Sequence, residues 1–134
     1  MKKKKPASTK LQTMYSSKKP AFLKKTDKRY ARHMKQLKTR GFSDSETWSL
    51  YSVIVGFVLP RLIRFKQIRP GYPMGMTDKE WNDILDKMIF AFQWIKDDGS
   101  EEYYKLSTKQ LDDGHKKCQE GLKLFGEYFR NLWW

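Results

Sequence analysis

The chain has 134 residues, and its 28 Lys and Arg side chains against 15 Asp and Glu give a formal charge of +13. Aromatic residues make up 15% of the sequence, which is too many for a chain that is disordered throughout. Eight Gly and five Pro exclude a collagen-like protein. A chain of this length usually forms one domain.

The positive charge is concentrated near the N-terminus. Residues 1–40 carry fifteen Lys and Arg against one acid, Asp27, whereas residues 41–134 have a net charge of −1 and hold most of the aromatic side chains. The sequence therefore predicts a basic N-terminal arm, residues 1–40, on a near-neutral helical body. Arms of this kind bind polyanions, most often nucleic acid and sometimes an anionic membrane or an acidic protein.

Cysteine content and hydropathy indicate in which cellular compartment the protein is expected. Cys118 is the single cysteine, so no intrachain disulfide is expected. Met1–Lys5 is not followed by an apolar segment, and we expect no secretory signal. The longest apolar stretch, Val53–Leu59, is far shorter than the roughly 20 residues of a spanning helix. We expect no transmembrane segment and a soluble, cytosolic protein.

Three segments are predicted: a disordered basic tail over residues 1–23, a basic amphipathic helix over 24–41, and a helical domain over 42–134. For the short helix we expect Thr26 as the N-cap and Gly41 as the first residue past the C-terminus. A narrow apolar stripe follows one side of this helix: Tyr30, Met34 and Leu37.

A long helix is predicted next, beginning at a capping box formed by Ser43 and Glu46. Pro60 removes one helical hydrogen bond, and because residue 56 is Gly we expect a kink there and not a break. Apolar side chains at spacings of three and four form a stripe along this helix: Trp48, Tyr51, Val55, Val58, Leu62 and Phe65. Ile54, Phe57 and Leu59 widen the apolar surface, so we expect the helix to be buried on most sides.

The following helix is predicted to begin at a second capping box, Thr77 with Glu80, after a Pro- and Gly-rich turn over residues 70–76. Met76 and Trp81 occupy the positions of a hydrophobic staple. An apolar stripe runs along this helix: Trp81, Leu85, Met88, Phe92 and Ile95. An acidic loop is expected over residues 97–102.

The last segment has a heptad-like apolar stripe that includes two candidate buried polar residues: Leu111, His115, Cys118, Leu122, Phe125, Phe129 and Leu132. Gly114, Gly121 and Gly126 are costly inside a helix, and close approach of a neighbouring helix would explain them. We expect Trp133 and Trp134 to pack against the body. No segment has a strand pattern, so the predicted fold is all-α, a three-helix bundle preceded by the basic arm.

The sequence contains little that indicates a catalytic or metal-binding site. His115 and Cys118 lie three residues apart, but a zinc site needs about four ligands, so we expect structural roles for both. Asp83 and Asp86 share a helix face that is typical of an exposed surface. No nucleotide-binding glycine motif occurs. We therefore expect no catalytic, cofactor-binding or metal-binding residues, and a protein that is not an enzyme.

Nucleic-acid binding is the best-supported hypothesis, through contacts to the phosphate backbone of DNA or RNA. The alternative to phosphate binding by the short basic helix is that its charged face is only exposed to solvent. Aromatic residues among the lysines, Tyr15, Phe22 and Tyr30, make stacking on single strands conceivable. The candidate phosphate-binding residues are Lys2, Lys3, Lys4, Lys5, Lys18, Lys19, Lys24, Lys25, Lys28, Arg29, Arg32, Lys35, Lys38 and Arg40. A possible second patch consists of Arg61, Arg64, Lys66 and Arg69.

Residues 41–134 resemble a group of small helical proteins encoded by tailed bacteriophages and prophages. The resemblance is carried by Gly41–Asp44, Trp48–Leu50, Leu59–Leu62, Phe65–Lys66, Gly71–Pro73, Trp81–Ile89, Ala91–Phe92, Glu120–Phe125 and Tyr128–Trp133. It implies a helical fold and a phage setting, in the cytoplasm of the infected host or associated with the virion. No established activity comes with the group, so no functional residue is implied.

The sequence thus favours a non-enzymatic phage accessory protein that binds nucleic acid without sequence preference. The alternative is a protein-binding module that docks on a host or viral complex, with Tyr72 and the Trp133–Trp134 end in the interface and the arm on an acidic protein face. A structural virion component is a third hypothesis. The sequence leaves the partner and the oligomeric state open.

Overall fold

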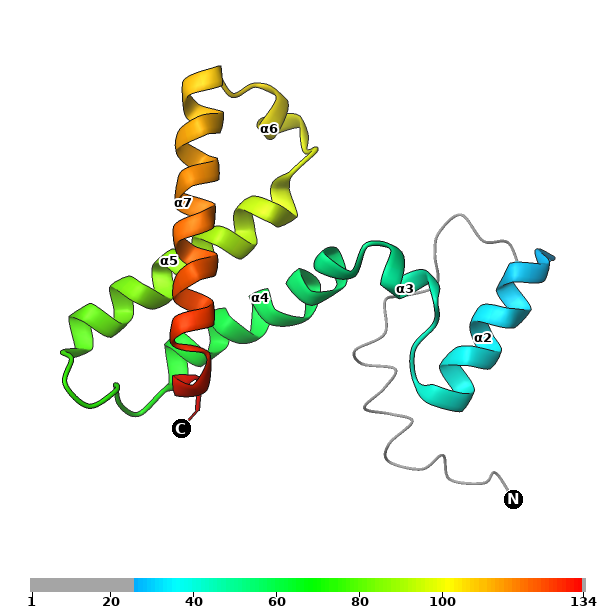
Figure 1. Cartoon of the computed structure of the whole chain (residues 1–134), viewed down its shortest axis with the longest axis horizontal. Coiled ribbons are helices and arrows are strands. Elements are labelled where there is room, and N and C mark those ends of the chain that lie inside the picture. Colours follow the sequence, from blue (N-terminus) through cyan, green and yellow to red (C-terminus); the bar gives the residue numbers. More distant parts are fainter. Residues whose placement is uncertain (1–25, 134) are drawn as a thin grey trace. The chain divides into compact units, whose positions relative to one another are not determined.

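The computed structural model describes residues 26–133 of the chain (Figure 1). The predicted tail over residues 1–23, and Trp134, lie outside the described residues. Within residues 26–133 every regular element is a helix, so the all-α prediction is confirmed for this part of the chain. The chain divides into two compact units, Met1–Ile54 and Val55–Trp134, and each is taken by itself below.

Helix α2 (Lys28–Arg40) is the predicted basic helix. Its N-cap is Asp27 and not Thr26, because the Asp27 carboxylate accepts a hydrogen bond of 2.8 Å from the backbone N–H of Arg29. Gly41 follows the helix with φ 87°, a left-handed conformation that glycine adopts without strain. The one buried residue of α2 is His33, while Met34 from the predicted apolar stripe is 41% exposed.

The predicted continuous helix from Ser43 is wrong. The chain instead forms α3 (Ser45–Trp48) and α4 (Leu50–Ile68), separated at Ser49, whose φ of −118° and ψ of 57° are not helical. Only half of the expected capping box is present. The Ser43 N–H donates to Glu46 Oε2 at 2.6 Å, whereas the Ser43 hydroxyl bonds the hydroxyl of Ser45.

Helix α4 passes through Pro60 without a break. Its buried residues are Val55, Leu59 and Leu62, which is a single stripe. The prediction of burial on most sides is therefore wrong, since Tyr51 is 62% exposed. The remaining exposed apolar residues of α4 are Leu50, Ile54, Ile63 and Ile68.

Helices α5 (Asp78–Asp97) and α7 (Thr108–Glu127) form the centre of the second unit, where α7 crosses α5 (Figure 1). The predicted box at the start of α5 is confirmed, because Thr77 and Glu80 exchange both hydrogen bonds. A second complete box, Ser107 with Gln110, begins α7 and was not predicted.

The close approach predicted from the glycines is confirmed at two of three positions on α7. A Cβ added to Gly121 would lie 2.2 Å from the carbonyl oxygen of Lys87, and one on Gly114 would lie 2.1 Å from the ring of Trp94. Nothing lies within 4 Å of such an atom at Gly126. The backbone of α7 therefore packs directly on α5 through its glycines.

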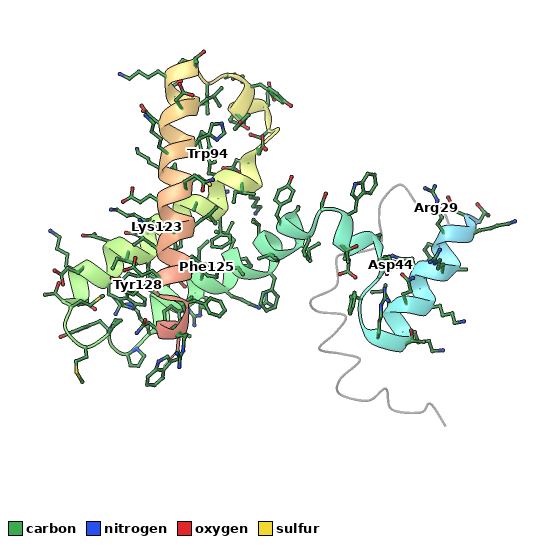
Figure 2. All side chains as sticks on the ribbon, in the orientation of Figure 1. Arg29, Asp44, Trp94, Lys123, Phe125 and Tyr128 are labelled. Carbon is green, nitrogen blue, oxygen red and sulfur yellow. The ribbon has the colours of Figure 1, made fainter. Side chains whose placement is uncertain are left out.

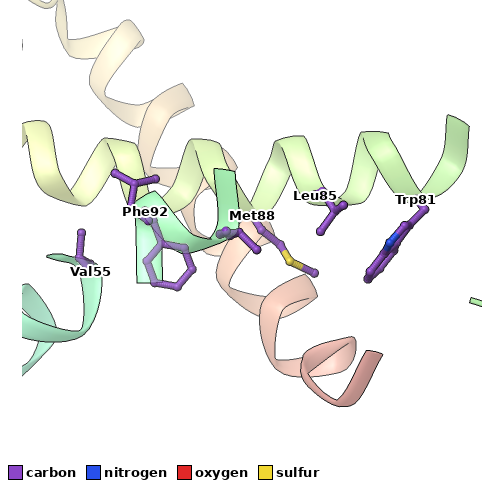
Figure 3. Close-up of a cluster of buried hydrophobic side chains, with 7 residues drawn as sticks. Val55, Trp81, Leu85, Met88 and Phe92 are labelled. Atoms are coloured by element: carbon purple, nitrogen blue, oxygen red, sulfur yellow. The ribbon is translucent and has the colours of Figure 1, made fainter. Parts of the chain in front are cut away.

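The core of the second unit is one cluster of buried side chains from α4 and α5 (Figure 3), and partly buried side chains of α7 pack against it. Trp81, Leu85, Met88 and Phe92 project from the same side of α5, as the predicted stripe requires, and are at most 3% exposed. Met76, the first residue of the predicted hydrophobic staple, packs against this cluster, which contains its predicted partner Trp81. Phe92 and Phe125 meet edge to face with centroids 4.9 Å apart.

Two predictions for the connections are wrong. The expected acidic loop contains one turn of helix, α6 (Glu101–Tyr104), because the Ser100 side chain caps it through the N–H of Tyr103. After α7 a 3-10 turn, Phe129–Asn131, leads to Trp133, which is 75% exposed and does not pack as expected. In the part of the chain that the structure describes, no helix could cross a membrane.

Candidate nucleic-acid interface

Four cationic residues lie on one side of α2 and are exposed. They are separated by four, three and three positions, which places them along a single face of a helix. We call this set the cationic face: Lys28, Arg32, Lys35 and Lys38. His33, the buried residue of α2, points to the opposite side, so packing within the first unit leaves the cationic face in solvent.

Among the four, three carry uncompensated charge. Lys28, Lys35 and Lys38 have no ion pair with any residue in the described part of the chain. Arg32 makes only a long contact, 3.8 Å from Nη2 to a carboxylate oxygen of Asp44, and its side chain is 77% exposed. These groups can approach phosphate without first breaking a close ion pair.

The two other cations of α2 are engaged within the protein. Arg29 donates to both carboxylate oxygens of Asp27, to Oδ1 from Nε at 3.2 Å and to Oδ2 from Nη2 at 2.8 Å. Arg40 forms an ion pair with Asp44 and donates from Nε to the carbonyl oxygen of Phe42 at 3.1 Å. The sequence placed all six cations in one class, whereas the structure separates the cationic face from this pair.

Asp44 ties α2 to the segment that follows it (Figure 2). Gln36 donates to Asp44 Oδ2 and accepts from the Asp44 N–H, both at 2.8 Å. The hydrogen bonds from Arg40 and then from Gln36 hold the pKa of Asp44 below its ordinary value, so this carboxylate is ionised at neutral pH. Its charge is thus balanced by Arg40.

Beneath these contacts lies a small buried polar core. His33 is 3% exposed, and its Nδ1 is 3.0 Å from the hydroxyl of Ser45, which in turn lies 2.6 Å from that of Ser43. Glu46, 6% exposed, accepts from the Ser43 N–H. Packing in the first unit therefore depends on hydrogen bonds more than on apolar burial, and these bonds fix the position of α3 beside α2.

A pocket of about 270 Å³ lies between α2 and α3 in the first unit. The exposed indole of Trp48 stands at its edge, 84% accessible to solvent. We call it the Trp48 pocket, and its lining residues are Arg29, Arg32, His33, Gln36, Asp44, Ser45 and Trp48. Arg32 belongs both to this pocket and to the cationic face, so the two are contiguous.

The residues of the possible second patch all have interactions within the protein. Arg69 donates to the Gly71 carbonyl oxygen and to Asn82 Oδ1 at 2.7 Å and pairs with Asp78 at 2.9 Å, and its side chain is only 6% exposed. Lys66 pairs with Asp86. The guanidinium of Arg61 lies 4.0 Å over the ring of Phe57, and Arg64 bonds Gln67. Lys66 and Arg69 thus connect to α5.

The candidates for metal or nucleophilic chemistry, His115 and Cys118, differ in burial. His115 is exposed, contrary to expectation, and accepts from the Trp94 indole N–H at 3.3 Å; Figure 2 shows Trp94 extending from α5 toward α7. Cys118 is buried as expected, and burial raises the pKa of its thiol. Across residues 26–133 no group of three or more His, Cys, Asp or Glu could hold a metal ion.

The second unit carries a pocket of about 330 Å³, which we call the Tyr72 pocket. Three large apolar side chains at this pocket are exposed, Tyr72, Met74 and Trp133. Its floor includes the buried Trp81, and the remaining lining residues come from the turn after α4 and from the chain end: Pro70, Gly71, Pro73 and Asn131. Trp134, the other half of the predicted aromatic end, lies outside the described residues.

Comparison of the chain with protein-family models, with curated proteins and with solved structures gave no match. Function must therefore be argued from the residues themselves. The sequence identified the cations of α2 but not Trp48 as a candidate binding residue, because its spacing from Tyr51 and Val55 indicated a buried stripe. Only the structure brings Arg29, Arg32 and Gln36 to Trp48, since they are 12 to 19 positions away in the sequence.

Proposed function

We propose that the protein is a non-enzymatic nucleic-acid-binding protein that contacts phosphates through its N-terminal arm without reading sequence. The observation that carries the proposal is the cationic face of α2. Its four side chains are exposed, three of them have no ion pair among the described residues, and they follow one line along the helix. Lysine and arginine bind phosphate chiefly through charge, so binding of this kind depends on salt and not on base sequence.

In this proposal α4, α5 and α7 form a three-helix bundle, and the arm supplies the phosphate contacts. The lysines of residues 1–25 would add to the same electrostatic interaction. The resemblance of residues 41–134 to phage proteins supports an infected-cell setting, in the host cytoplasm or with the virion. The near-neutral body gives no comparable electrostatic attraction, since residues 41–134 carry a net charge of −1.

The test compares two full-length variants that lose the same charge. The first replaces the cationic face with glutamine, at Lys28, Arg32, Lys35 and Lys38. The control replaces four exposed lysines of the second unit, at Lys96, Lys109, Lys116 and Lys123. Binding to a fluorescent duplex is measured over a series of salt concentrations.

The slope of log K against log salt is negative. If all four residues contact phosphate, the magnitude of this slope is smaller by roughly 3 to 4 units in the first variant. The control leaves the slope close to that of the unmodified protein. Equal effects of the two variants would show that net charge, and not the α2 surface, drives binding. Weak binding by the unmodified protein near physiological salt would refute the proposal itself.

A second candidate function is a protein-binding module, and the Tyr72 pocket favours it. Exposed Tyr, Trp and Met side chains around a concave site are typical of protein interfaces. Met74 is fully exposed and Trp133 is 75% exposed. A Trp133→Ala variant that lost a partner retained by both glutamine variants would support this candidate over nucleic-acid binding.

A further inference from the structure

The side chain of Trp48 is the starting point. Tryptophan has the largest apolar side chain, and Trp48 is 84% exposed. It lies on the short helix α3, in which Glu46 is buried. The backbone of α3 is therefore held in place while the ring projects into solvent. At this exposure the ring gives the folded first unit little burial energy, and an exposed aromatic ring is available to stack on another ring.

The position of the ring connects it to the cationic face. Trp48 and Arg32 both line the Trp48 pocket, and Arg32 continues into the line of Lys28 and Lys35. Single-stranded nucleic acid is bound by this combination, in which cations follow the backbone while bases stack on aromatic side chains. Bases inside a duplex are stacked on each other and cannot reach such a ring.

Charge in the pocket permits a polyanion beside it. Three carboxylates belong to this part of the first unit: Asp44 pairs with Arg40, Asp27 pairs with Arg29, and Glu46 is buried, where it accepts from the Ser43 N–H. Arg32, Lys28 and Lys35 then leave this edge of the first unit net positive. An acidic peptide would also find the cations, but it would make no particular use of an exposed indole.

The polar groups of the pocket are largely committed to one another. Both amide atoms of Gln36 are bonded to Asp44, and the Ser45 hydroxyl lies between His33 and Ser43. Among the described residues, the donors left over are those of Arg32, which the proposal assigns to phosphate, and the buried Nε2 of His33 has no partner, so the pocket offers little for reading the edge of a base. Stacking needs no such reading, because every base presents an aromatic face.

We propose that the Trp48 pocket is a base-stacking site that makes the protein prefer single-stranded nucleic acid over duplex. A base of the strand stacks on Trp48 while its backbone follows Arg32 and the adjoining lysines. The pocket volume of about 270 Å³ is close to the smallest ligand sites, which begin near 300 Å³, and suits a single base and not a longer ligand. This proposal rests on the proposed nucleic-acid-binding function, and it adds that the preferred ligand is single-stranded.

The test uses the full-length protein with two probes, a labelled oligothymidylate of about 20 nucleotides, long enough for one binding site, and a duplex of the same length. The variant is Trp48→Ala, and Trp48→Phe keeps an aromatic ring. Trp133→Ala is the matched control, since it removes another exposed indole, 75% accessible, from the second unit. Circular dichroism verifies that each variant keeps its helix content.

The expected result is a loss of affinity for the single strand of about 5- to 150-fold in Trp48→Ala, the range measured for one stacked base. Trp48→Phe should recover much of that loss, Trp133→Ala should bind like the unmodified protein, and duplex binding should change by less than about 2-fold. Full single-strand affinity in Trp48→Ala, or an equal loss for both probes, overturns the stacking site and leaves salt-dependent phosphate binding intact. If the unmodified protein binds neither probe, the proposed function fails along with it.

Discussion

Replacing Gly121 with alanine tests how α5 and α7 pack. The new Cβ would lie 2.2 Å from the Lys87 carbonyl oxygen and 2.6 Å from the Ala91 Cβ, about 1 Å inside ordinary contact with the first. Because the obstructing atom is backbone, no side-chain rotation relieves the overlap and the helices must separate. Overpacking of this kind costs about 1–3 kcal/mol, and rigid backbone places it at the upper end.

The same change also gains about 1 kcal/mol, because alanine is a better helix former than glycine. The net expectation for Gly121→Ala is a loss of about 2 kcal/mol in the free energy of unfolding. At about 4 °C per kcal/mol for a protein of this size, the Tm falls by about 8 °C. The measurement is thermal and urea unfolding followed by circular dichroism at the helix band.

Gly126→Ala is the matched control, in the same helix and with nothing within 4 Å of the new atom. It gains helix propensity without the overlap, and because Gly126 lies in the last turn of α7 its Tm should rise by up to about 4 °C. The two substitutions should therefore act in opposite directions. If Gly121→Ala is as stable as the unmodified protein while Gly126→Ala behaves as expected, the helices do not touch at Gly121 and the packing argument is wrong.

Three further predictions concern charge and burial. Arg69→Met removes the contacts to Asp78 and Asn82, and should lower the free energy of unfolding by about 2–3 kcal/mol in urea titrations, while Arg64→Met should have little effect. Cys118 is 5% exposed and burial raises its thiol pKa, so an aromatic disulfide reagent at pH 8 should label it only in denaturant; prompt labelling of folded protein would contradict the buried position. The pKa of Asp44 is lowered in the folded protein, so its contacts stabilise above the ordinary carboxyl pKa near 4 and are lost as pH falls through the lowered value. The Gln36 side-chain amide signals should change over that acidic range, and Asp44→Asn should abolish the change.

Local signals in the sequence were enough where the structure depends on neighbouring residues. Thr77 and Glu80 close a capping box within four residues, and Gly41 ends α2 with a positive φ that glycine accepts. The stripe on α5 was found because its buried side chains are large and regularly spaced, as Trp81 and Phe92 illustrate. Here propensity, capping and burial all favour the same helix.

Helix α7 shows why a stripe of large residues can mislead. The apolar pattern predicted a buried His115, but the buried positions on this side are Gly114, Cys118 and Gly121. The ring of Trp94 occupies the space above Gly114, so the helix is rotated toward its small residues and His115 reaches solvent. Gly114 and Gly121 indicated in the sequence where α7 contacts α5. Because glycine has no side chain, a contact made through glycines does not appear in the pattern of apolar residues.

The candidate site was predictable in charge and not in geometry. Composition located the cations of α2, but only the structure shows that Arg40 pairs with Asp44 while Lys35 has no ion pair among the described residues. The break at Ser49 was missed for a related reason. The hydrogen bond between Ser45 and His33 ties α3 to α2, and the spacing of apolar residues in the sequence does not indicate such a contact.

The central claim is that the cationic face of α2 is the surface that meets nucleic acid. The most direct measurement is an amide NMR titration of the full-length protein with a short oligonucleotide near physiological salt. The account predicts that, within residues 26–133, the largest shifts fall on α2 and α3, around Arg32, Lys35 and Trp48. Shifts centred on Tyr72 and Trp133, or on the exposed side of α7, with α2 unchanged, would contradict it.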